Sequence, residues 1–367
     1  MQIKENNAHN FHINNILKRL EEKELDAMLV ANFNNIYYLS GYLSTSFAFL
    51  IIKENPIIFV SGMDLENAHN TSSIDIVKYE SYDKLIEYLK EEGIMNLAME
   101  SDLAASVYEK FKDFNLSFSD AISKERMIKT DDEIEKIVKA TDIAHKSLLE
   151  LDVRSKQEKG ALEWECAYEL GYLMRKNGAS VESFDTIFAS GPVSSLPHST
   201  PRQAILETPV LVDYGCKFEG YCSDTTRTFI YTEKQEEISD IVLEAHDKAI
   251  DAVKEGVKAC EVDKVARDII TEYGYGENFI HSTGHSLGLD IHENPSLSMK
   301  DQTVLENNMI VTIEPGIYLE GEFGIRIEDM VLVDKKGKLS GNLPQILYFI
   351  FFNFFTNFLF FFFNFLI

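Results

Sequence analysis

The stretch IVTIEPGIYLEGEFGIRIEDMVLV, residues 310–333, has the pattern of two β-strands around a turn. Apolar and polar residues alternate along both arms, many of them β-branched, and Gly321 lies near the midpoint. A turn centred near Gly321 sets Glu314 opposite Glu328, with Arg326 on the same face as Glu328. Two carboxylates that face each other among Ile and Val repel, and burial adds a desolvation cost. We therefore expect a cation or a shared proton at this position.

Residues 210–231, VLVDYGCKFEGYCSDTTRTFIY, repeat this arrangement. Asp213 follows one apolar arm and Asp224 opens the other, so the two carboxylates are predicted to face each other across a second hairpin. One buried acidic pair has a simple alternative explanation, a salt bridge to Arg227. Two hairpins of the same kind point instead to four converging carboxylates, which about two divalent cations would neutralise, since oxygen ligands suit ions such as Mg and Mn.

Histidines are concentrated between the two hairpins, in FIHSTGHSLGLDIHENP, residues 279–295. His281, His285 and His292 are three of the nine histidines in the chain, and their close spacing between glycines indicates a site. His198 lies in SGPVSSLPHSTP, a loop sequence rich in Gly, Pro and Ser, and site residues concentrate on loops. The alternative for His198 is an ordinary surface loop residue.

Residues 284–288 also fit G-x-S-x-G, the nucleophile elbow of α/β-hydrolases. The elbow needs an apolar strand before it and a helix after it, whereas polar residues precede this segment and Pro295 follows it closely. A triad in that fold also needs a histidine after the acid, and His292 is the last histidine of the chain. The sequence contains no P-loop, GxGxxG or HExxH motif.

The 367-residue chain carries 35 basic and 60 acidic residues, a net charge of −25. This excess of acid argues against binding to nucleic acid or to an anionic membrane, both of which attract clustered Lys and Arg. The four cysteines are scattered without a CxxC pair, which predicts neither a disulfide framework nor a Cys zinc site and suits a reducing, cytoplasmic location. The first residues, MQIKENNAHNFHINN, lack the apolar core of a signal peptide.

Three segments are predicted along the chain. Residues 1–125 alternate apolar strands and amphipathic helices, which indicates a small α/β domain with helices packed on a mixed sheet. Residues 126–345 run helices, strands, helices, strands, beginning with a predicted capping box of Thr130 and Glu133. Residues 346–367 are apolar and rich in Phe, and we expect them to stand outside the fold. Helices are expected over residues 16–23, 82–92, 163–176, 236–255 and 261–273.

The Phe-rich segment has two interpretations. From residue 347 onward there are 21 uncharged residues, 11 of them Phe, which is long enough to span a bilayer. Three asparagines interrupt it, however, and Phe, Asn, Leu, Ile and Tyr all have codons made only of A and T. We hypothesise that the segment is read-through or frameshifted translation of AT-rich DNA, with a membrane anchor as the alternative. Recovery of the Phe-rich peptide from the natural protein, with an intact reading frame, would contradict this hypothesis.

The motifs VDYG, SDTTRT, TGHSLGLDIHE, TIEPGIY and GIRIED, in this order and spacing, resemble those of the proline-specific metallopeptidases with the pita-bread fold. This is the Xaa-Pro aminopeptidase and prolidase family, with methionine aminopeptidases as more distant relatives. The resemblance runs from Thr130 to about Val333 and more loosely through the N-terminal domain, where NNIYYLSGY is typical. It implies an α/β (α+β) chain with a small N-terminal α/β domain before a pita-bread, creatinase/aminopeptidase-type catalytic domain.

The resemblance also implies roles for individual residues. It implies a pair of divalent ions, manganese in the first place and cobalt or zinc as alternatives, bound by Asp213, Asp224, His285, Glu314 and Glu328. Glu314 would also act as general base. The histidines that would steady the substrate carbonyl and the tetrahedral intermediate are His198 and His292, and supporting positions are filled by His281, Tyr318 and Arg326. Peptide substrates with proline in second position and a homodimer follow from the same resemblance.

One position departs from the family pattern. Prolidases often have an arginine four residues after the histidine that matches His292, where it can hold the carboxylate of a dipeptide, and here that position is Ser296. The sequence therefore favours an Xaa-Pro aminopeptidase, with an Xaa-Pro dipeptidase as the alternative. A methionine aminopeptidase and an inactive pita-bread binding scaffold are disfavoured by the extra N-terminal domain and by the five filled ligand positions.

Overall fold

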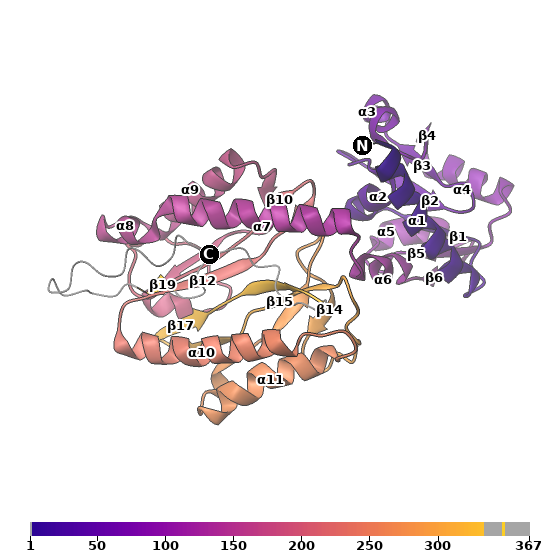
Figure 1. The fold of residues 1–367 in the computed structure, drawn as a ribbon. Coiled ribbons are helices and arrows are strands. Elements are labelled where there is room, and N and C mark those ends of the chain that lie inside the picture. The colour runs from indigo at the N-terminus through magenta and orange to yellow at the C-terminus, as the bar shows by residue number, and fades with distance from the viewer. Residues whose placement is uncertain (1, 334–346, 349–367) are drawn as a thin grey trace. The chain divides into compact units, whose positions relative to one another are not determined.

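The computed structural model describes residues 2–333 and 347–348, with side chains described for residues 9–333. Contacts within the chain divide it into two compact units (Figure 1). Unit 1 comprises Met1–Lys129 and a short later segment, Gly288–Asn294. Unit 2 comprises Thr130–Leu287 and the chain from Pro295 onward. No helix among the described residues is long and apolar enough to cross a membrane.

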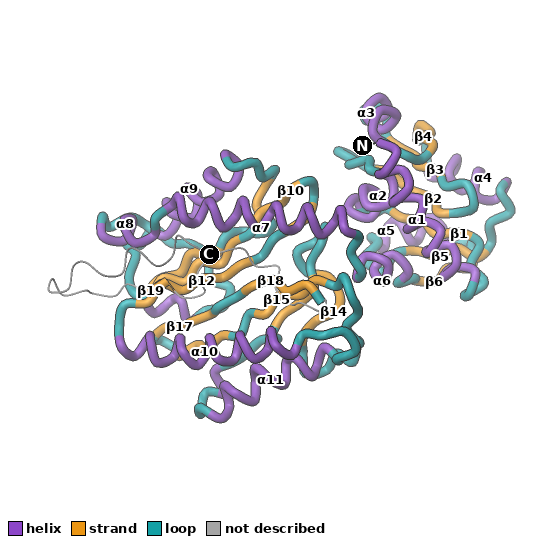
Figure 2. The backbone as a smooth tube through the Cα atoms, viewed as in Figure 1, coloured by secondary structure: helices purple, strands orange, loops and turns teal. Residues whose placement is uncertain are grey.

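Unit 1 is built on a mixed sheet with the strand order β4-β3-β2-β1-β5-β6 (Figure 2). The strands β1 and β2 are buried at every position, as expected for central strands that are covered on both faces. The elements of unit 1 are α1 (Gln2–Glu21), β1 (Ala27–Val30), α2 (Phe33–Ser40), β2 (Ala48–Ile52), β3 (Ile57–Val60), α3 (Leu65–Thr71), β4 (Asp75–Lys78), α4 (Tyr82–Glu91), β5 (Asn96–Met99), α5 (Ala105–Tyr108), η1 (Glu109–Phe111), β6 (Asn115–Phe118) and α6 (Ala121–Met127).

Unit 2 contains strands that form several small sheets and helices that pack on them. Two sheets have the strand orders β19-β12-β9-β8 and β14-β13-β15-β18. The elements are α7 (Asp131–Leu151), α8 (Val153–Glu158), α9 (Glu163–Lys176), β7 (Val181–Glu182), β8 (Ile187–Ser190), η2 (Gly191–Ser195), β9 (Val210–Tyr214), β10 (Cys216–Phe218), β11 (Tyr221–Cys222), β12 (Thr225–Ile230), α10 (Glu233–Ala252), α11 (Ala259–Glu272), η3 (Gly276–Asn278), β13 (Gly284–Ser286), β14 (Glu293–Leu297), β15 (Ile310–Ile313), β16 (Gly316–Leu319), β17 (Phe323–Arg326), β18 (Asp329–Leu332) and β19 (Leu347–Tyr348).

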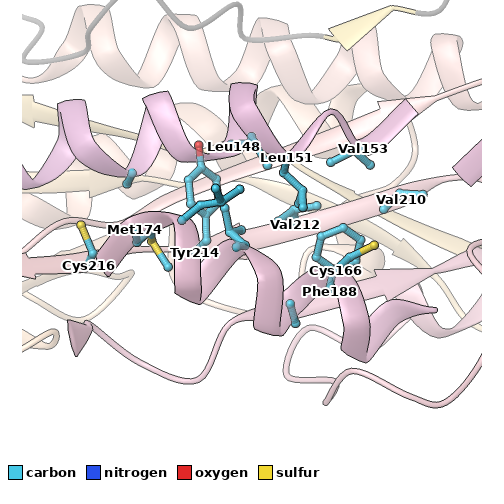
Figure 3. Close-up of a cluster of buried hydrophobic side chains, with 14 of the residues drawn as sticks. Leu148, Leu151, Val153, Cys166, Met174, Phe188, Val210, Val212, Tyr214 and Cys216 are labelled. Atoms are coloured by element: carbon cyan, nitrogen blue, oxygen red, sulfur yellow. The ribbon is translucent and has the colours of Figure 1, made fainter. Parts of the chain in front are cut away.

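The apolar face of α7 packs with α9 onto the sheet of β8, β9 and β12 (Figure 3). Leu148 and Leu151 on α7 meet Val210 and Val212 on β9, and Phe188 of β8 is fully buried among them. On the other side, α10 packs beside α11 and against β15, β16 and β17 (Figure 1). These two helix pairs enclose the strands that carry the predicted acidic residues.

Several predicted elements are confirmed, and one is wrong. The helix expected over residues 163–176 is α9, and Thr130 forms a capping box with Glu133 at the start of α7, as predicted. The first helix begins at Gln2 rather than near residue 16, because its polar N-terminal half hides the apolar pattern.

The strand β19 falls inside the Phe-rich segment that was expected to stand outside the fold. Its residues Leu347 and Tyr348 pair in parallel with Phe229 and Ile230 of β12, so these two residues belong to a sheet. The rest of the Phe-rich segment lies outside the described residues.

Candidate metal centre and active site

The predicted hairpin of residues 310–333 has the register that the sequence indicates. Ile313 pairs with Asp329 and Gly316 with Arg326, so the turn is centred at Gly321 as predicted. The same register places Glu314 and Glu328 opposite each other, in the gap between the β15–β18 ladder and the β16–β17 ladder. Within this gap their backbone N–H groups turn outward, that of Glu314 to Thr283 O (2.8 Å) and that of Glu328 to Thr226 O (3.2 Å).

In the predicted hairpin of residues 210–231, the strand pairing is offset by two residues from the prediction. Phe218 pairs with Tyr221, so the turn residues are Glu219 and Gly220, both with positive φ, as in a tight two-residue hairpin. Asp213 consequently pairs with Thr226 and not with Asp224. The two carboxylates nevertheless remain close enough for Asp213 to raise the pKa of Asp224, after burial itself.

Two glycines allow the backbones to approach at this site. A Cβ on Gly215, between β9 and β10, would lie 1.9 Å from the carbonyl oxygen of Ser223. A Cβ on Gly284, next to His285, would lie 1.9 Å from the carbonyl oxygen of Thr312. Any larger residue would push these strands apart, so the position of His285 depends on glycine at its neighbour.

The structure brings three of the five predicted ligands into one tight group. Ligand atoms of Asp224, His285 and Glu328 all lie within 4.8 Å of one another. Glu314 borders the group, since its Oε1 and the Oδ2 of Asp224 each lie 3.5 Å from His285 Nε2. Asp213 is held by Arg326, which donates to its Oδ2 (2.5 Å), while its buried Oδ1 has no hydrogen-bond partner among the described residues.

The tautomer of His285 makes this group a fit for a cation. Its Nδ1 lies 3.0 Å from the carbonyl oxygen of Ser286, which can only accept, so Nδ1 carries the hydrogen. In the neutral ring Nε2 then presents a lone pair toward the oxygens of Asp224 and Glu314. Acceptors that face one another in a partly buried space are stabilised by a positive ion between them, and imidazole nitrogen with carboxylate oxygen is a common donor set for divalent transition metals.

The charges on the acidic residues oppose one another strongly. Burial raises the pKa of Asp224 well above its usual value, and the carboxylates of Asp213 and Glu314 raise it further. Burial, Asp224 and Glu314 have the same effect on the pKa of Glu328. The pKa of Asp213 is also raised by burial, although the Arg326 guanidinium partly offsets this. These directions agree with a site that lacks positive charge until a cation binds.

The supporting residues Arg326, Tyr318 and His281 form one hydrogen-bonded chain. Arg326 Nη1 donates to the Tyr318 hydroxyl (2.7 Å), which donates in turn to His281 Nε2 (2.8 Å). His281 Nδ1 donates to the carbonyl oxygen of Ser282 (2.8 Å), which fixes its tautomer. Burial lowers the pKa of His281, so its ring is neutral at neutral pH.

The sequence analysis did not predict some of the residues that organise the site. The Thr226 hydroxyl donates to Glu328 Oε2 (2.7 Å) and accepts from Arg326 Nε (3.0 Å), so it joins the two hairpins. The buried carboxylate of Asp263 accepts two bonds from Arg267 and one from the Thr283 backbone, while Arg267 donates to the His281 carbonyl (2.8 Å). The alternating TTRTF of β12 was a signal for Thr226, because its alternate residues lie on one face.

Arg227, which the sequence offered as an alternative salt-bridge partner for the acidic pair, forms its ion pair with Asp329. Arg227 is fully buried and donates to Asp329 Oδ1 (2.6 Å) and to the carbonyl oxygen of Glu328 (2.6 Å). It therefore fixes the backbone at Glu328, and Arg326 is the arginine that pairs with Asp213.

His198 lies in an exposed loop after η2. The preceding residue, Pro197, accepts a bond from Arg326 Nη1 (3.4 Å), and His198 lies near enough to lower the pKa of His281, after burial and Arg326. The two ends of the loop are tied together by Glu163, whose fully buried carboxylate accepts from the backbone N–H groups of Ser190 (3.0 Å) and Arg202 (2.9 Å).

His292 is exposed and lies in Gly288–Asn294, the segment that packs with unit 1. It follows His285 by seven residues along the chain. Its expected part in catalysis remains a prediction from the family resemblance.

Comparisons with known proteins identify the family. The chain matches metallopeptidase family M24 over residues 132–335 and the creatinase/prolidase N-terminal domain over residues 12–137. It is 40% identical over 333 residues to the Xaa-Pro dipeptidase of Pyrococcus furiosus, which covers 88% of this chain and 94% of that relative. The chain therefore belongs to metallopeptidase family M24, and the resemblance inferred from its motifs is confirmed.

Solved structures confirm the fold. The prolidase from Pyrococcus horikoshii OT3 matches with a TM-score of 0.85 and 37% identity, over 92% of this chain and 99% of that chain. The X-Pro aminopeptidase from Thermotoga maritima MSB8 matches with a TM-score of 0.82 and 33% identity, again over 92% and 99%. Membership of a metallopeptidase family implies the use of a divalent metal.

The raised carboxylate pKa values predict how metal-free protein responds to pH. A folded-state pKa above the unfolded value contributes stability that is fully present below the unfolded pKa, near 4, and is lost as pH rises through the folded pKa. As the pH rises above the unfolded value near 4 and toward the raised carboxylate pKa values, the melting temperature of metal-free protein should therefore fall progressively below that of metal-loaded protein.

Thermal unfolding with a chelator or with added manganese, at each pH, measures this difference. The variant Asp224→Asn removes one repelling charge and should flatten the pH dependence of the metal-free form. Parallel curves with and without metal across this range would contradict the prediction.

Proposed function

We propose that this protein is an Xaa-Pro dipeptidase, which splits dipeptides whose second residue is proline. The observation that carries this proposal is the 40% identity to a relative named Xaa-Pro dipeptidase over 88% of the chain. A second Xaa-Pro dipeptidase, from Pyrococcus horikoshii, is 39% identical over 340 residues. The comparisons thus favour what the sequence offered as the alternative over the aminopeptidase that it favoured.

The five predicted ligands, Asp213, Asp224, His285, Glu314 and Glu328, would hold two divalent ions. Four carboxylates and one imidazole supply hard oxygen donors with a single nitrogen, a set that suits manganese, with cobalt or zinc as alternatives. Two divalent ions also balance the negative charge of the four carboxylates better than a single ion would.

Bound divalent cations lower the pKa of water and neutralise negative charge that develops on the substrate carbonyl. The Glu314 carboxylate accepts the proton of the attacking water, because its Oε1 lies at the edge of the ligand group, 3.5 Å from His285 Nε2. His198 and His292 donate from imidazole nitrogen to the carbonyl oxygen and the leaving nitrogen. Thr312 contacts both His285 and Glu314. Its hydroxyl accepts a hydrogen bond from the His285 backbone N–H (3.0 Å) and lies 3.4 Å from Glu314 Oε1.

A substrate with proline in second position presents an amide nitrogen without hydrogen. The site cannot select it through a donor at that nitrogen and must recognise the ring. The neutral His281 ring, which packs edge-on against the buried Tyr318 ring with 5.4 Å between centroids, supplies aromatic surface for this recognition.

An Xaa-Pro aminopeptidase is the second candidate, favoured by Ser296 and by the match to the Thermotoga maritima aminopeptidase. Serine cannot form the charge-assisted pair with a dipeptide carboxylate that arginine would form there. A cytoplasmic location fits the free thiols of Cys166, Cys216, Cys222 and Cys260. A homodimer is expected only from the resemblance.

Hydrolysis assays separate the candidates. Manganese-loaded protein should release proline from Ala-Pro and cleave Ala-Pro-Ala and longer Xaa-Pro peptides more slowly, with Ala-Ala as the control substrate. Release should require added metal and stop with a chelator. Faster cleavage of Ala-Pro-Ala than of Ala-Pro would favour the aminopeptidase, and no cleavage of any proline peptide by loaded protein would reject both.

Glu314→Gln tests the general base. The amide keeps the shape of the side chain but cannot take a proton, so kcat should fall by about 100-fold or more. Melting temperature and metal content are measured on the same sample to separate lost basicity from lost metal. Turnover that stays close to that of the unchanged protein, with metal bound, would show that another group accepts the proton.

A further inference from the structure

The segment Gly288–Asn294, a loop together with the first two residues of β14, is folded around one carboxylate, that of Glu293. Its Oε1 accepts from the backbone N–H of Asp290 (3.2 Å). A Cβ on Gly288 would lie 2.6 Å from the same oxygen, so glycine is needed where the loop passes the carboxylate. Glu293 follows His292 directly in the chain, so whatever fixes Glu293 also fixes the backbone that carries this histidine.

Two buried cations from the end of the N-terminal region hold Glu293. Arg126, near the end of α6, donates from Nη2 to Glu293 Oε1, and Lys129 Nζ donates to Oε2 (3.2 Å). The Lys129 side chain is only 1% exposed and that of Arg126 8%. Burial opposes the ionisation of Glu293, but Lys129 and Arg126 outweigh it and hold its pKa below the usual value.

The loop has a second acidic anchor in Asp290. Arg126 Nη2 also donates to Asp290 Oδ2 (2.8 Å), and Asn34 Nδ2 donates to Asp290 Oδ1 (2.5 Å). The amide oxygen of Asn35 accepts from Arg126 Nη1 (2.6 Å), which orients the guanidinium. Two acids in the loop therefore match two cations outside it, with the asparagines completing the hydrogen bonds.

The four paired charges, Arg126, Lys129, Asp290 and Glu293, restrict the segment more than ordinary surface ion pairs do. Surface ion pairs are weak and tolerate movement, whereas a buried pair with satisfied hydrogen bonds admits one geometry. The two acids and two cations together fix the conformation of seven residues, Gly288–Asn294. The one predicted catalytic residue among them is His292, so we infer that the fixed conformation serves to position this histidine.

We propose that Arg126 and Lys129 are positioning residues for His292, acting through Glu293 and Asp290. The inference rests on the proposed function, because it takes His292 as a residue that contacts the substrate. On this proposal, Arg126 and Lys129 act on His292 without contacting the substrate themselves. The alternative is that the network only stabilises unit 1.

A double-mutant cycle separates positioning from stabilisation. Arg126→Met should lower kcat/KM for Ala-Pro by about 10- to 100-fold, the usual result of misplacing a reacting group. In a His292→Ala background the same change should cost less than about 2-fold, because there is no longer a histidine to position. Metal content should stay unchanged in all variants, since neither residue is among the predicted ligands.

Two further variants keep the cycle decisive. Asp290→Asn removes one anchor at a half-exposed acid, so it should fold if Arg126→Met does not, with a smaller loss and the same dependence on His292. Arg19→Met is the matched control, because Arg19 is another arginine of unit 1, with its ion pair to Glu125 at 3.8 Å. It should leave kcat/KM within about 2-fold. Equal losses with and without His292 would overturn the proposal.

Hydrogen exchange gives a readout that does not need activity. In Arg126→Met, amides of residues 288–294 should exchange faster, while those of α9 should not change, and Arg19→Met should leave the loop protected. Unchanged loop exchange would overturn the proposal. If the unaltered protein cleaves no Xaa-Pro dipeptide, the proposed function fails, and exchange still decides whether Arg126 holds the loop.

Discussion

Repulsion among buried carboxylates is the constraint on which this catalytic unit depends. Asp213, Asp224 and Glu328 have raised pKa values because burial and their acidic neighbours both oppose ionisation. The sheet accommodates this by interrupting its ladder where Glu314 and Glu328 lie, so their backbone N–H groups bond to Thr283 and Thr226 instead. Among the described residues, Arg326 forms its ion pair with Asp213, and a divalent metal relieves the remaining deficit of positive charge.

A second regularity concerns the loops that carry the histidines. Each is held by a buried carboxylate paired with arginine: Glu163 with Arg202 beside His198, Asp263 with Arg267 beside His281, and Glu293 with Arg126 beside His292. Such pairs are costly to bury and contribute little net stability, but their fork geometry fixes direction. The loops gain definite positions from them, which a catalytic histidine needs and an ordinary surface loop does not.

The features that could be predicted from the sequence are those that a local residue pattern determines, namely strand register and helix bounds. The alternation of apolar and polar residues around Gly321 predicted the register that places Glu314 opposite Glu328. The apolar periodicity predicted both ends of α9 correctly. The sequence did not predict that Asp213 pairs two residues away from Asp224. That register depends on which two residues form the turn, and Glu219 gives no strong signal for a positive φ. The anchoring arginines escaped because Arg202 is 39 residues from Glu163 and Arg126 is 167 from Glu293, and no local rule joins such positions.

The placement of Gly288–Asn294 changes how the N-terminal region should be understood. A chain that lacked residues 1–129 would leave Glu293 and Asp290 without Arg126, Lys129 and Asn34, and two acids of a seven-residue loop would lose their buried partners. Unpaired carboxylates return to water, so that loop could not keep its conformation around Glu293. A family member without the N-terminal domain must therefore fix the corresponding loop in another way. In this chain the first domain supplies the buried partners of the segment that carries His292.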